Sequence, residues 1–216
     1  MRGPKRGSGP RSNAYSESKC SNWTRFDPFV SEVRALPANL RPDMLAPLQS
    51  GEDVAIFVRP LHADFVRPFS PEAVRDALAV LPGEFVSGLD AVYLLAGSSK
   101  QAKVALGDLS RYGCYGYGKI FLYAFPKRTM AYRLKRSPKP SVMQQYVRAG
   151  ATLIQDSGGY ELRFTESALR QFYLTEVLLH EVAHHVMRDG PQKNRRAEER
   201  FADWFAHNRA QKLKRK

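Results

Sequence analysis

The segment from Glu166 to Asp189, ESALRQFYLTEVLLHEVAHHVMRD, constrains the fold of this chain more than any other. It contains neither Gly nor Pro, and it lies between Thr165, a good N-cap residue, and the helix-breaking pair at 190–191. Glu166 places a negative charge in the first turn, where it suits the helix dipole. The segment therefore predicts one long helix. Its buried face is predicted to consist of Leu174, Leu178, Leu179, Val182 and Val186.

The stretch LLHEVAHH of this helix, residues 178–185, contains four ionisable side chains in an otherwise apolar run, and three of them are His180, Glu181 and His184. Residues four apart lie one turn above each other, so the two imidazoles point from the same face and can bind one metal ion. Glu181 lies beside them, close enough to take a proton from a water molecule on the metal. The HExxH spacing therefore predicts a zinc site in which Glu181 is the catalytic base.

A catalytic zinc needs a third protein ligand and one position open to water. A candidate ligand follows fifteen residues after His184, in the segment AEERFADWFA. Glu199 and Asp203 are four residues apart and therefore share one face of a second predicted helix, roughly 194 to 212. We expect this helix to fold back on the first, so that Glu199 completes the ligand set. Asp203 would then orient a ligand histidine through its second ring nitrogen.

The same acidic residues have an alternative interpretation. Glu198, Glu199 and Asp203 would, in that case, form ion pairs on a solvated helix face with Arg195, Arg196 and Arg200. The HExxH motif upstream favours the metal-ligand interpretation. The apolar stripe of this second helix is predicted to consist of Phe201, Trp204 and Phe205.

HEVAH followed by ERFAD resembles the gluzincin metallopeptidases, whose pattern is HExxH and then a Glu followed four residues later by an Asp. More narrowly, it is similar to the minimal gluzincins, compact intracellular zinc peptidases that include those cleaving bacterial transcriptional repressors. The resemblance covers about residues 165 to 207. It implies that His180, His184 and Glu199 are zinc ligands, that Glu181 is the base, and that Asp203 supports a ligand.

The resemblance also implies the fold class, an α+β zincin-like metallopeptidase domain. In such a domain a small mixed sheet packs on the long HExxH helix, and a C-terminal helix carries the third ligand. An edge strand beside the site helix aligns the peptide, and the run from Lys119 to Phe125 is the candidate for it. A metzincin would carry a histidine where this chain has Gly190, and Spartan-type DNA-crosslink proteases also use a third histidine.

Upstream of the motif the chain reads as alternating strands and helices. Strands are expected at 53–59 and 89–97, and a helix capped by Ser70 is expected to run to Leu81. Two hairpins are expected, one bent hairpin at 111–125 and one at 151–164 that turns at Asp156 to Gly159. The predicted organisation is a basic, Pro- and Ser-rich flexible leader at 1–50, the zincin-like domain at 51–210 with a basic insertion at 127–140, and a basic tail at 211–216.

The formal net charge of the 216 residues is +13, and it gathers in the segments 2–11, 127–139 and 209–216. Such segments suit a polyanion such as nucleic acid, or they form a solubilising fringe. No apolar run reaches the roughly 18 residues of a membrane span, and no secretory signal is recognisable. Cys20 and Cys114 lack CxxC spacing and read as free thiols. We therefore expect a soluble cytoplasmic protein without a membrane partner.

The sequence thus predicts a zinc metalloendopeptidase, a gluzincin-like hydrolase of an unidentified intracellular protein. A substrate associated with nucleic acid is the most specific form of this hypothesis. The alternative is a basic nucleic-acid-binding or scaffold protein with a structural or inactive metal site. The remaining histidines, His62, His185 and His207, are expected to be packed or exposed rather than ligands. The residue that stabilises the transition state electrophilically stays open among Tyr112, Tyr115, Tyr117 and Tyr173.

Overall fold

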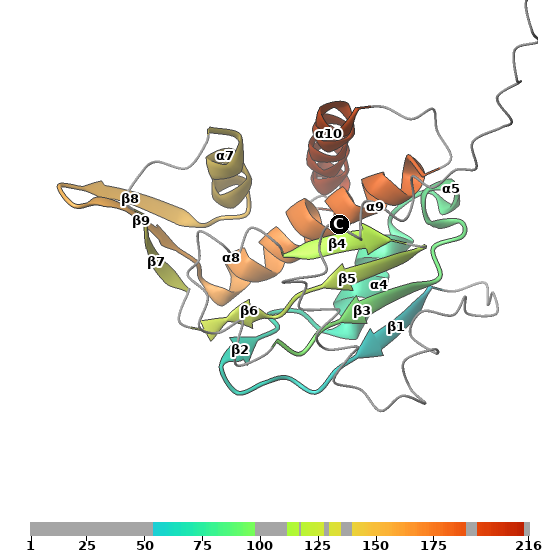
Figure 1. The fold of residues 1–216 in the computed structure, drawn as a ribbon, viewed down its shortest axis with the longest axis horizontal. Helices are drawn as coiled ribbons and strands as arrows, with labels where there is room; N and C mark the ends of the chain where they lie inside the picture. The colour runs from blue at the N-terminus through green and yellow to red at the C-terminus, as the bar shows by residue number, and fades with distance from the viewer. Residues whose placement is uncertain are drawn as a thin grey trace, which may run out of the picture.

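The computed structural model describes residues 54–97, 112–116, 118–127, 130–134, 140–188 and 194–213 (Figure 1). The predicted leader at 1–50, with its basic segment 2–11, lies outside the described residues, as does Tyr117. The described part mixes helices with small sheets, in agreement with the α+β class predicted from the sequence.

A four-stranded mixed sheet lies beneath the site helix, the long helix that carries His180, Glu181 and His184. Its strand order is β1 (Ala55–Val58), β3 (Ala91–Leu94), β5 (Lys119–Leu122) and β4 (Gly113–Gly116). The first three strands run parallel, and β4 runs antiparallel to β5. These strands confirm the predictions at 53–59 and 89–97 and the hairpin at 111–125.

The edge strand differs from the one expected. The apolar run that begins at Lys119 forms β5, which lies between β3 and β4, so its prediction as the edge strand is wrong. All four residues of β5 are buried, whereas those of β4 are only partly buried. A strand that is covered on both faces reads as a continuous apolar run, so the apolar residues of β5 indicate its burial and not its place in the strand order.

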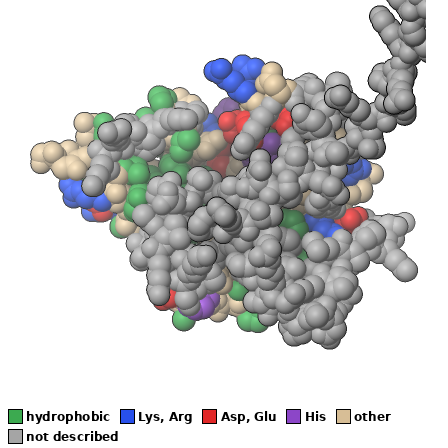
Figure 2. Space-filling view, in the orientation of Figure 1, with side chains coloured by type: hydrophobic (Ala, Val, Ile, Leu, Met, Phe, Trp, Pro, Cys, Tyr) green, Lys and Arg blue, Asp and Glu red, His purple; other side chains and the backbone are tan. Residues whose placement is uncertain are grey.

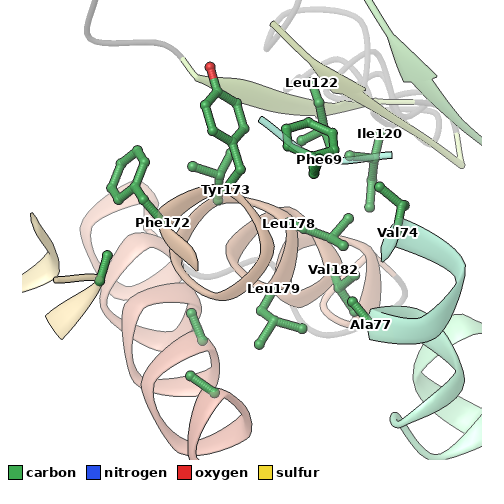
Figure 3. Close-up of a cluster of buried hydrophobic side chains, with 14 of the residues drawn as sticks. Phe69, Val74, Ala77, Ile120, Leu122, Phe172, Tyr173, Leu178, Leu179 and Val182 are labelled. Carbon is green, nitrogen blue, oxygen red and sulfur yellow. The ribbon is translucent and has the colours of Figure 1, made fainter. Parts of the chain in front are cut away.

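The two faces of this sheet carry different clusters because strand side chains alternate. Val92, Leu94, Ile120 and Leu122 join the main core with the helices, whereas Tyr93, Phe121 and their neighbours form a second cluster. Figure 3 shows Leu178 and Val182 of the site helix on the same side as Val74 and Ala77 of α4 (Pro71–Ala79). The sheet and α4 therefore fix the buried side of the site helix.

The site helix is continuous but not uniform. It consists of α8 (Glu166–Gln171), the π-helical segment η3 (Phe172–Val177) and α9 (Leu178–Val186). Thr165 caps it, as predicted, because its hydroxyl oxygen accepts the Ala168 N–H at 3.0 Å. The π turn was not predicted, and such wider turns are frequent next to functional sites.

The helix α4 begins as the sequence predicts, with the Ser70 hydroxyl accepting the Ala73 N–H at 3.2 Å. It ends at Ala79, two residues before the predicted end at Leu81, and a short helix, α5 (Gly83–Val86), follows it. A small antiparallel pair is formed by β2 (Phe65–Val66) and β6 (Phe125–Pro126).

A second antiparallel sheet stands beside the site helix, in the order β7 (Ala131–Leu134), β9 (Gly159–Arg163) and β8 (Thr152–Asp156). The predicted hairpin turning at 156–159 is confirmed. The basic segment 127–139 supplies β7, which pairs with β9, so residues 131–134 of this segment belong to a sheet. The helix α7 (Pro140–Arg148) follows it and contacts both β8 and η3.

The C-terminal helix α10 (Arg195–Leu213) packs against α9 and confirms the predicted helix at 194–212. Its buried face is formed by Ala202, Phe205, Ala206 and Ala210. Trp204 is 58% exposed, so its placement in the apolar stripe was wrong. Small alanine side chains bring α10 close to its neighbour on one face, and Trp204 lies outside that face.

Among the helices of the described residues, none combines the length and the apolar character that a membrane crossing requires.

Candidate metal centre

His180 and His184 project from the same side of α9, one turn apart. Their Nε2 atoms are 3.2 Å from each other. Leu178 and Val182 on the same helix are fully buried, which fixes the rotation of α9 and leaves the imidazoles on its partly accessible side. The sequence prediction that these two side chains converge is therefore met by the geometry.

Glu199 reaches the same point from α10, with Oε2 3.3 Å from His180 Nε2. The ligand atoms of His180, His184 and Glu199 all lie within 4.8 Å of one another, and these residues form the group that could hold a metal ion in the described part of the chain. Ligand atoms about 2.1 Å from a tetrahedral zinc are about 3.4 Å apart, so two of the separations already match. The Glu199 side chain is 49% exposed and has room to close the remaining separation.

The second ring nitrogen of His180 is held by Asp203, whose Oδ1 is 3.1 Å from Nδ1. With a carboxylate as the acceptor, Nδ1 keeps the proton of the neutral ring, and Nε2 of that tautomer presents its lone pair toward His184 and Glu199. This is the orienting contact that the spacing of Glu199 and Asp203 predicted. The same Oδ1 also accepts a hydrogen bond from the Gln145 side chain of α7 at 3.0 Å.

The electric field at His180 favours a cation. Burial lowers the pKa of His180, but the hydrogen bonds with Asp203 and Glu199 and the charge of Glu181 outweigh it and raise the pKa to about 10. Figure 2 shows acidic and histidine side chains gathered at the surface in the upper part of the molecule. A divalent metal ion can take the place of the proton on Nε2, and imidazole nitrogens together with carboxylates are a donor set that suits such an ion.

Glu181 is buried between α9 and β4. Burial raises the pKa of Glu181 to about 7, and the charge of Glu199 adds to this rise, whereas the charge of His180 and a hydrogen bond from the Tyr115 backbone N–H oppose it. A carboxyl group with a pKa near neutrality both takes up and releases protons readily. Glu181 therefore has the environment of a proton-transfer group beside the three ligand candidates.

The close approach of β4 to α9 depends on Gly113. A Cβ atom at this position would lie 2.8 Å from Val177 Cγ1 and 3.2 Å from Glu181 Cγ. Glycine in a strand is typical of such close backbone approaches. The absence of a side chain thus lets β4 bring its Tyr115 N–H onto the Glu181 carboxylate.

We expect Gly113→Ala to destabilise the protein by about 1–3 kcal/mol, because the added methyl group overpacks this contact. The matched control is Gly83→Ala, since a Cβ at Gly83 meets nothing within 4 Å. Denaturant unfolding of both variants measures the difference. Equal stability of the two variants would contradict the close packing of β4 on the site helix.

The other histidines are placed as predicted. His185 is buried, with Nε2 3.0 Å from the Ser87 carbonyl oxygen and Nδ1 3.2 Å from the Tyr115 hydroxyl. His62 lies 3.7 Å from Asp64 near β2, and His207 is exposed on α10. None of the three belongs to the group of described residues that could hold a metal ion, which consists of His180, His184 and Glu199.

The tyrosines named as electrophiles have other contacts. Tyr173 is buried and donates its hydroxyl to the Tyr123 carbonyl oxygen at 2.7 Å. Tyr112 pairs with the Tyr146 hydroxyl at 3.1 Å, and burial raises the pKa of Tyr112 well above its usual value. Tyr115 reaches the site through its backbone N–H, while its hydroxyl faces His185.

Two contacts of this site, those of Gln145 and Gly113, were not predicted from the sequence. Gln145 lies 58 positions before Asp203, and a glutamine in a helix gives no signal of such a contact. Gly113 does give a signal, since strand glycines indicate close approach, but the glycines at 113–118 equally predict the bend of a hairpin.

Comparison with known proteins yields no match to a family model, to a curated protein or to a solved structure.

Proposed function

We propose that this protein is a zinc-dependent metallopeptidase that hydrolyses peptide bonds of an intracellular protein. The observation that carries the proposal is the convergence of His180, His184 and Glu199 from two helices, with the buried carboxyl group of Glu181 next to them. The same residues carry the resemblance to the minimal gluzincins.

Zinc is the metal that best suits this donor set. Two imidazole nitrogens and one carboxylate form a set typical of catalytic zinc, in which the fourth position takes water or substrate. A structural zinc has four protein ligands, and the group in the described residues has three. The donor set therefore favours catalysis over a purely structural role.

In this proposal His180, His184 and Glu199 would hold a zinc ion, which would act as a Lewis acid on the scissile carbonyl group and on the attacking water. Glu181 accepts the proton of that water at its carboxylate and then delivers the proton to the leaving amine. Asp203 keeps the His180 ring in the tautomer whose Nε2 faces the site. Burial of Glu181 keeps its proton affinity high enough for both transfers.

The strand β4 offers a place for the substrate backbone. Among the described strands it pairs only with β5, and the site helix packs against it. An extended peptide can add to such an edge through main-chain hydrogen bonds. The run from Lys119 does not fit this role, because it forms β5, which is an internal strand.

The net charge of +13 favours a substrate associated with nucleic acid, and it also supports the second candidate, a basic nucleic-acid-binding or scaffold protein. Recruitment to nucleic acid through the basic segments is tested by neutralising the charges at 2–11. Deleting the other basic segment, 127–140, would remove β7 from its sheet and so disturb the fold. Weaker, less salt-dependent DNA or RNA binding with unchanged peptide cleavage would support recruitment to nucleic acid. Salt-dependent binding by a chain without metal-dependent cleavage would favour the second candidate.

The proposal predicts cleavage of an unfolded labelled protein that stops on treatment with a zinc chelator and returns on addition of zinc. The reason is that the chelator removes the Lewis acid and leaves the fold of the buried core in place. Product formation by mass spectrometry measures the reaction. Cleavage that continues in the metal-free protein would exclude this mechanism, and a denatured chelator-treated protein, detected by circular dichroism, would point to a structural metal.

A further inference from the structure

The helix α7 is fixed to the segment that precedes the metal ligands. Arg148 forms a two-pronged ion pair with Glu176 of η3, with Nη2 to Oε2 at 2.6 Å and Nε to Oε1 at 3.1 Å. The Glu176 side chain is 4% exposed, so this pair is shielded from water on the carboxylate side. The Tyr146 hydroxyl, on the same helix, lies 3.1 Å from that of Tyr112. The position of α7 relative to the site helix is thus strongly determined.

From this fixed helix Gln145 reaches the carboxylate that supports His180. Its amide nitrogen donates to Asp203 Oδ1 at 3.0 Å, the same oxygen that lies 3.1 Å from His180 Nδ1. The Asp203 side chain is 43% exposed, and α10 alone does not prevent it from turning toward water. Arg148 lies near enough to be stabilised by the Asp203 charge. Thus α7 contributes both a donor and a positive charge next to Asp203.

We infer that Gln145 is a positioning residue of the metal centre: it holds Asp203 Oδ1 on His180 Nδ1 and thereby keeps Nε2 aimed at the metal. The inference rests on the proposed metal site. Its physical basis is that a hydrogen bond from a fixed helix selects one rotamer of a carboxylate that is otherwise half exposed. Hydrogen-bonding partners behind a ligand change metal affinity by about 10–100-fold when they are removed.

The test compares Gln145→Met with Gln144→Met. Gln144 is the neighbouring residue on α7 and is exposed, whereas Gln145 is half-buried and donates to Asp203, so the control carries the same substitution without the loss of that contact. Zinc affinity is measured by competition with a chromophoric chelator. We expect Gln145→Met to bind zinc about 10-fold more weakly and Gln144→Met to bind as the wild type does. Gln145→Ala, which removes the donor without adding an apolar chain, is expected to show the same loss.

A double-mutant cycle separates positioning from general damage to α7. In an Asp203→Ala background, Gln145→Met should lower zinc affinity by less than about 2-fold, because the group that Gln145 holds is gone. The melting temperatures of the metal-free proteins show whether the variants fold. Wild-type affinity in Gln145→Met, or an undiminished loss in the Asp203→Ala background, would overturn the inference and leave the metal site standing. Failure of the wild type to bind zinc would instead overturn the proposed function.

Discussion

Replacement of Glu181 by glutamine is expected to lower kcat for peptide hydrolysis by about 1000-fold or more while zinc remains bound. Glutamine has nearly the same shape and its amide oxygen can still accept the Tyr115 N–H, but it cannot take up a proton. General base catalysis contributes about 10²–10⁴-fold, which sets the expected loss. The buried position of Glu181 means that no outside carboxylate replaces it.

The matched control for this variant is Glu198→Gln. Glu198 lies on α10 next to the ligand candidate Glu199 but does not belong to the group that could hold a metal ion. It should retain both zinc and activity. Single-turnover kinetics and zinc content, measured on the same preparations, separate loss of the base from loss of the metal. Full activity of Glu181→Gln would remove Glu181 from the mechanism.

Replacement of Glu199 by alanine should weaken zinc binding by more than about 100-fold, because losing a ligand costs more than losing a group behind one. The remaining pair, His180 and His184, lies on α9 and holds one side of the site only. Glu198→Ala is the control, since this neighbour has the same charge and lies in the same helical turn. Competition with a chelator of known affinity measures both variants.

Equal zinc affinity of Glu199→Ala and Glu198→Ala would support the alternative interpretation, in which these acidic residues form surface ion pairs. The geometry argues against it for Glu199, whose Oε2 lies 3.3 Å from His180 Nε2. Melting temperatures with and without zinc provide a second readout, since a ligand stabilises the folded state according to its affinity.

The sequence predicted the site helix and the two histidines on one side of it, because helix capping and residue spacing are local properties of the chain. Thr165 caps the helix through the Ala168 N–H, and the spacing of His180 and His184 alone places both rings on one side. The return of α10 was also predictable, because Glu199 and Asp203 share a helical face. For both pairs, the spacing of the two residues within one helix decides that their side chains share a face.

The rest of the site depends on contacts between distant segments. The edge position of β4 follows from strand order, which the apolar pattern of Lys119 to Leu122 does not reveal. The contact of Gln145 with Asp203 depends on how α7 docks, and that docking depends on the Arg148 ion pair with Glu176. Pairings of this kind leave no periodic signal in the sequence. The π turn at Phe172–Val177 has no signal of its own either, since its residues fit an ordinary helix equally well.

Zinc per chain, measured by elemental mass spectrometry on protein purified without added metal, tests the central claim most directly. After this purification, zinc is supplied to the wild type and to a variant with both His180→Ala and His184→Ala, the excess is removed, and the bound zinc of the two proteins is compared. We predict about one zinc per chain in the wild type and almost none in the double variant. Wild-type protein that takes up no zinc, or a double variant that takes up as much, would contradict the assignment of His180, His184 and Glu199 as a metal centre.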